Sequence, residues 1–155
     1  MTRLYVGTGR VGTDRVGGFI VVAEEEGDLE MVLVDRLTTY ADLLSLISTR
    51  VYPMILPQKP TLPAVTYQRI DGPREHGMTE EQDMAHLRIQ IDSWAETKAD
   101  AKGVAAEIMN ALERWTDTAT SPVILDSFLD NDESSYEPDT NIHRIRQDWI
   151  IWHRE

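Results

Sequence analysis

Four prolines in the segment VYPMILPQKPTLP, residues 51–63, constrain this chain more than any other feature. They stand at positions 53, 57, 60 and 63. Proline lacks a backbone N–H and fixes its own φ angle, and it disfavours the helical conformation in the residue before it. We therefore expect the segment to lack regular structure and to run as an extended, semi-rigid crossing that ends the helix before it.

Two strand patterns follow the prolines. Residues 64–70, AVTYQRI, read as a strand, and residues 85–94, AHLRIQIDSW, alternate apolar with polar side chains. A period of two is typical of a half-buried strand. The polar segment between them, residues 71–83, contains two glycines and a proline. We expect the two strands to form a hairpin with a long exposed tip.

Helical spacing of apolar residues occurs on both sides of this hairpin. The first helix is predicted from Leu37, Tyr40, Leu44 and Ile47, with Asp35, Thr38 or Thr39 as its cap. The second helix has a capping-box spacing at Thr97 and Asp100. Its apolar stripe consists of Ala101, Val104, Ala105, Ile108, Leu112 and Trp115.

The C-terminal part of the chain predicts two more strands, at residues 123–129 and 142–155, separated by an acidic loop at 130–141. Side chains alternate along a strand, so Trp149 and Trp152 lie on opposite faces. Either one lies in the core and the other at an interface, or both are core positions of a sandwiched sheet. The expected fold is α+β in the order α, β, β, α, β, β. Two helices pack on a four-stranded, largely antiparallel sheet.

The first 30 residues differ from this body, residues 31–155. They end in the acidic run EEEGDLE and contain Gly7, Gly9 and Gly12 in the spacing G-x-G-x-x-G. That spacing binds dinucleotides when a buried strand leads into it and a helix follows, and neither pattern is present here. We interpret residues 1–30 as an extended or hairpin arm that packs on another surface, such as a neighbouring subunit.

Charge and composition exclude several classes of protein. The formal net charge is −12, which opposes tight binding to nucleic-acid phosphates. The chain has no cysteine, so it has neither disulfides nor a thiolate metal site. The longest apolar run, residues 19–23, is too short to cross a membrane. We expect a soluble protein.

The acidic segments do not match the spacing of a metal or catalytic site. Residues 75–86 hold several carboxylates and two histidines without an H-E-x-x-H or three-ligand pattern. The segment DNDESSYEPDTN begins like a calcium loop but has Ser135 and Asn141 where glycine and glutamate are required. No G-x-S-x-G motif occurs. We expect no metal, no cofactor and no enzymatic activity.

Several segments together resemble a known family. They are the turn Arg50-Val51-Tyr52-Pro53, the strand entry Pro63-Ala64-Val65-Thr66-Tyr67, and QIDSWAETKADA, where a strand ending in Trp94 leads into an alanine-rich helix. In order and spacing, residues 37–115 resemble the tail-completion, or tail-terminator, proteins of long-tailed bacteriophages and gene transfer agents. The 30-residue arm departs from the family pattern, and the C-terminal strands follow it loosely.

The resemblance implies a virion structural protein, assembled in the host cytoplasm. Such proteins form a ring, commonly a hexamer, at the head-proximal end of the tail tube. The ring stops tube polymerisation and joins tail to neck, so its expected partners are its own copies, the tail tube protein and a neck or head-completion protein. DNA passes through the lumen without tight binding. The alternatives are another connector component, such as a head-completion or stopper protein, and a ligand-binding regulatory α+β domain.

Charged residues of the predicted hairpin and one tryptophan are the candidate contacts between subunits or rings. Arginine is enriched at interfaces, and the arginines here stand among acids. The candidates are Arg69, Arg74, Glu75, His76, Glu80, Glu81, Arg88 and Trp152.

Overall fold

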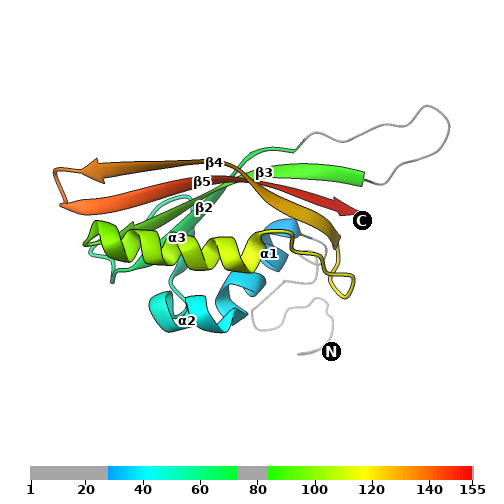
Figure 1. Ribbon diagram of the computed structural model, residues 1–155, viewed down its shortest axis with the longest axis horizontal. Coiled ribbons are helices and arrows are strands. Elements are labelled where there is room, and N and C mark those ends of the chain that lie inside the picture. The colour runs from blue at the N-terminus through cyan, green and yellow to red at the C-terminus, as the bar shows by residue number, and fades with distance from the viewer. Residues whose placement is uncertain (1–27, 73–83, 155) are drawn as a thin grey trace, which may run out of the picture.

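The computed structural model describes residues 28–72 and 84–154, and within them all helices lie on one side of a single β-sheet (Figure 1). The helices are α1 (Leu29–Thr39), α2 (Ala41–Ile47) and α3 (Lys98–Leu112). The strands are β1 (Val51–Pro53), β2 (Ala64–Asp71), β3 (Met84–Ala95), β4 (Val123–Glu137) and β5 (Ile142–Arg154). The α+β class predicted from the sequence is confirmed.

The sheet has the strand order β1-β2-β3-β5-β4 and is mixed. Three of its four pairings are antiparallel, including the predicted pairing of β2 with β3. The remaining strand, β1, was not predicted and pairs in parallel with β2. The prediction of four strands was therefore wrong in this detail: the first three residues of the proline segment form an edge strand, where Pro53 can stand without breaking a ladder on both sides.

The first predicted helix is two helices. Helix α1 begins at Leu29, and the Asp28 side chain accepts a hydrogen bond from the Glu30 N–H at 2.9 Å as its N-cap. Its buried residues recur every four positions at Leu29, Leu33 and Leu37. Tyr40 has an extended backbone and ends α1 while preceding α2. The acidic run at residues 24–30 concealed this helix, because the sequence analysis assigns that run to the arm and α1 begins within it.

Strand β4 is much longer than predicted. Residues 130–137 were expected to form an acidic loop, but they pair with β5 up to Glu137. All eight are exposed, and the ribbon that they form with β5 extends to one end of the molecule (Figure 1). Two register shifts interrupt the pairing, between Ile124 and Asp126 and between Leu129 and Asn131. Polar composition alone suggested a loop, whereas pairing with β5 makes it a strand.

The core lies between the helices and one face of the sheet. Trp149 is fully buried there, among Leu87, Ile89, Ile151 and the apolar stripe of α3. The predicted cap of α3 is present, since Thr97 Oγ1 accepts a hydrogen bond from the Asp100 N–H at 3.1 Å. At the other end of α3, Arg36 Nε donates to the Ala111 carbonyl at 2.9 Å and ties α1 to this helix.

Candidate assembly surface

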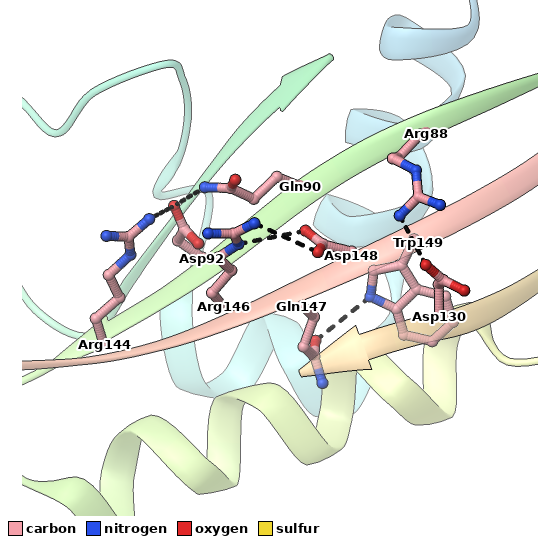
Figure 2. Close-up of polar contacts among 9 residues, drawn as sticks. All are labelled: Arg88, Gln90, Asp92, Asp130, Arg144, Arg146, Gln147, Asp148 and Trp149. Carbon is pink, nitrogen blue, oxygen red and sulfur yellow. Dashed lines mark hydrogen bonds and ion pairs between the residues drawn. The ribbon is translucent and has the colours of Figure 1, made fainter. Parts of the chain in front are cut away.

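The sheet face opposite the helices, called the open face below, is polar. Alternation along β3 and β5 places the core residues on the helix side and sends the intervening side chains to the other side. Figure 2 shows the two directions: Gln147 and Trp149 point toward α3, while the arginines and aspartates lie on the far side of the strands. The open-face residues of β3 and β5 are His86, Arg88, Gln90, Asp92, Trp94, Arg144, Arg146, Asp148, Ile150 and Trp152.

The most buried charge on the open face is Asp92. Its side chain is 8% exposed and pairs with Arg144 at 3.1 Å. The Gln90 amide donates to the same carboxylate oxygen at 2.9 Å. The Arg144 guanidinium lies 5.2 Å from the ring centre of Trp94, whose Nε1 donates to Thr66 Oγ1 at 2.9 Å. This chain of contacts joins β5, β3 and β2 into one fixed polar group. Figure 2 shows its central part, in which Gln90 and Arg144 meet at Asp92.

Two further arginine–aspartate pairs continue along the face. Arg146 lies 3.4 Å from Asp148, and Arg88 lies 2.7 Å from Asp130 on β4. The hydrogen bond to each aspartate is the main cause that raises the pKa of each arginine above its ordinary value, so both remain charged. Because each cation already faces an anion, the open face carries alternating charges rather than a basic stripe.

Two polar atoms within this network have no hydrogen-bond partner in the described part of the chain. They are Oδ1 of Asp92 and Nε of Arg144, and both are inaccessible to solvent in the single chain. Buried polar atoms are normally paired, so these two mark the point where the network is incomplete.

Trp152 lies on the open face at the other end of the strands. Its ring centre is 4.6 Å from that of His86, its direct neighbour on β3. Trp149, by contrast, is fully buried on the helix side. The predicted opposite placement of the two tryptophans is therefore confirmed, and Trp152 is the partly exposed one.

The remaining predicted contact residues divide into two groups. Arg69 is exposed near the end of β2, and its guanidinium lies so close to Gly72 that a Cβ there would be 2.7 Å from it. Arg88 makes its ion pair within the chain. The others are on the hairpin tip and lie outside the described residues: Arg74, Glu75, His76, Glu80 and Glu81. The glycine motif of the arm also lies outside them.

Sequence reasoning missed the open-face arginines of β5 and their aspartate partners. Arg144, Arg146 and Asp148 were assigned to a strand but not to a site, because each one alone is an ordinary surface residue. The alternation of Arg144, Arg146 and Asp148 against Ile145, Gln147 and Trp149 was the available signal.

Within residues 28–72 and 84–154, no three potential metal ligands come together. Residues 130–137 of the calcium-like segment belong to strand β4, and its first aspartate, Asp130, is paired with Arg88. None of the described helices is long and apolar enough to cross a membrane.

The fold and the open face define a small α+β protein with a one-sided helical layer and a paired-charge sheet surface. Residues 31–154 match the family model of the tail completion protein gp17. The match covers most of the chain, so the protein belongs to this family of phage tail structural proteins.

A solved structure supports the fold. A chain in the virion of a native gene transfer agent particle is similar, with a TM-score of 0.65 and 17% sequence identity. The similarity covers 79% of this chain and 92% of that chain. Comparison with curated proteins gives no sequence match.

Proposed function

We propose that this protein is the tail terminator: it forms a ring, with six copies, at the head-proximal end of the tail tube, where it stops tube polymerisation and joins the tail to the neck. The family match over residues 31–154 carries the proposal. The similar chain in a gene transfer agent virion supports the same type of particle for this fold.

The shape of the sheet suits a ring. Its two edges are unlike, because β1 has three residues and β4 has fifteen. A contact between unlike edges is head-to-tail, and repeated head-to-tail contacts close into a ring when the rotation between copies allows it. A contact between like edges would instead give a two-fold dimer.

The charge suits a passage for DNA. Six copies, each with a net charge of −12, repel a passing duplex, and the arginines of the open face are already paired with aspartates. Low affinity lets the DNA move through the lumen without being held by phosphate contacts.

The test is a reconstitution with purified full-length chain. Negative-stain images and native mass spectrometry are expected to show closed rings of six copies, and the rings are expected to bind one end of isolated tail tubes and to stop addition of tube protein. A chain that remains monomeric would refute the ring.

A second arm of the experiment compares tail tubes with portal-containing heads. Binding to the portal side in preference to tube ends would identify a head-completion or stopper protein instead, which shares the small α+β build.

A further inference from the structure

The outer edge of β4 is covered along only half of its length. Residues 113–117 cover the first half: Asp117 exchanges two backbone hydrogen bonds with Ile124, at 3.0 and 2.8 Å. Next to this bridge, the Arg114 N–H donates to the Ser127 carbonyl at 2.7 Å. The Leu129 N–H donates to a carboxylate oxygen of Glu113 at 3.2 Å. The cover ends there.

The second half, residues 130–137, is called the distal edge below. In the part of the chain that the structure describes, its backbone is hydrogen-bonded only within the hairpin. Ile124, Ser127 and Leu129 point their backbone groups outward and are paired with alternate residues of β5. The same alternation continues, so Asp132, Ser134 and Tyr136, paired with Gln147, Ile145 and His143, direct their N–H and C=O groups outward as well.

The distal edge has room for a complete strand. Its eight residues are all exposed and span about 26 Å at the rise of an extended strand. Its side chains include four acids, Asp130, Asp132, Glu133 and Glu137, and no base. Asp130 already pairs with Arg88 of the same chain, which leaves three acids for a partner strand. Charges on an edge discourage pairing with an identical strand and favour a strand of opposite charge.

The chain itself contains a segment of the required kind. Residues 1–16 carry Arg3, Arg10 and Arg15 and only one acid, Asp14. They include the strand-forming residues Leu4, Tyr5, Val6, Val11 and Val16, and no proline occurs before Pro53. The rest of the chain is therefore more acidic than its total charge indicates.

The start of α1 lies near strands β1 and β2, at the other end of the strand order from the distal edge of β4. Helix α1 contacts β1, and the pKa of Tyr67 on β2 is raised by burial and then by the nearby carboxylates of Glu30 and Asp28. Strands β3 and β5 separate β2 from β4. An N-terminal segment that leaves from the β1–β2 side is thus placed toward the next copy in a head-to-tail arrangement.

From these observations we infer that residues 1–16 of one copy add as an extra strand to the distal edge of β4 in the neighbouring copy. The backbone hydrogen bonds supply affinity, and the arginines facing the acids of β4 select the partner. The inference rests on the proposed ring, in which each copy donates its N-terminal segment to one neighbour and receives that of the other.

Cysteine pairing tests the contact directly, because the natural chain has no cysteine. One full-length variant carries Ser134→Cys, and a series of others carries a single cysteine at each position from 4 to 11. After mixing in pairs and mild oxidation, disulfide-linked heterodimers are expected, with yields that alternate from one position to the next because strand side chains alternate. Ser45→Cys on α2, also exposed, is the matched control and is expected to give no heterodimer.

Ser134→Pro tests the backbone pairing. The substitution removes an outward N–H and leaves the pairing with β5, whereas Ser134→Ala keeps the N–H. The proline variant is expected to keep its circular dichroism spectrum and to need a concentration about tenfold higher, or more, for half-assembly. The combined substitutions Arg3→Glu, Arg10→Glu and Arg15→Glu are expected to weaken assembly as well. Asp132→Lys with Glu133→Lys is expected to restore it.

The outcomes separate this inference from the proposed function. A wild-type chain that forms no ring refutes the ring. Wild-type rings that persist unchanged in Ser134→Pro and in the charge-reversal variant, with no heterodimer at any position, refute the strand exchange and leave the ring intact. In a further variant that carries Ser134→Cys together with one of the N-terminal cysteines, cross-links that form only within one chain also refute it.

Discussion

Replacing Arg144 with methionine isolates the energetic role of the open-face network. The substitution keeps an unbranched apolar side chain against Trp94 but removes the cation that is hydrogen-bonded to Asp92. Removing one partner of a fully buried ion pair costs about 3–5 kcal/mol. Arg144 is 26% exposed and the Gln90 amide still donates to Asp92, so we expect a smaller loss, about 2 kcal/mol of the free energy of unfolding.

Substituting the other partner of the ion pair is expected to lower the free energy of unfolding by a smaller amount. Asp92→Asn leaves Arg144 unpaired, but that guanidinium reaches water, and we expect a loss of about 1 kcal/mol. The double variant removes the buried charge altogether and is expected to be about as stable as Asp92→Asn alone. The two losses are therefore not additive, because the two side chains are in direct contact.

Urea unfolding followed by tryptophan fluorescence measures all three variants, at one fixed protein concentration so that assembly does not alter the comparison. Arg144→Lys is the control that keeps the charge while losing the planar guanidinium. Equal and additive losses for Arg144→Met and Asp92→Asn would refute the reasoning, since they would mean that the buried carboxylate needs no counter-ion.

The other predictions concern the arm, the hairpin tip and ligands. A chain that begins at Met31 loses the Asp28 cap and the buried Leu29. Thermal unfolding is expected to show that it is less stable than a chain that begins at Gly27, by about 1 kcal/mol for the cap alone. Equal stability of the two chains would contradict the role of the cap. Replacing residues 71–83 with a short Asn-Gly turn is expected to leave the unfolding temperature nearly unchanged and to abolish attachment to tail tubes; normal infectious particles would refute this. Titration of labelled duplex DNA, ATP and NAD at low salt is expected to show no micromolar binding. A tight complex with NAD would contradict this prediction and would favour a dinucleotide-binding site at Gly7, Gly9 and Gly12.

The sequence was informative where burial imposes a period. Leu87, Ile89 and Ile91 predicted β3, and Thr97 with Asp100 predicted the start of α3, because these patterns arise from local chemistry that the fold preserves. The opposite faces of Trp149 and Trp152 followed from the same alternation. Periodicity could also have revealed α1, whose buried leucines recur at Leu29, Leu33 and Leu37, but the acids before them dominated the interpretation.

The sequence was misleading where a segment is a strand only because it is hydrogen-bonded to a neighbouring strand. The distal edge has the composition of a loop and is a strand only because β5 lies beside it. Strand β1 is three residues long and contains a proline, and its parallel partner β2 follows only after the rest of the proline segment, with Val51 paired to Val65. The open-face network depends on which strands are neighbours, and the order β3, β5, β4 cannot be derived from the pattern of any single strand.

The half-covered hairpin of β4 and β5 has a consequence for the dynamics of the chain. Its first half lies over the core, where Ile124 is almost fully buried, while residues 130–137 are all exposed. The backbone amides of the second half are therefore expected to exchange with deuterium through local opening, at a far lower free energy than those of β3 or the buried part of β5. A docked strand would slow that exchange selectively, so deuterium uptake in these eight residues reports the occupancy of the edge in an assembled particle without any label or substitution.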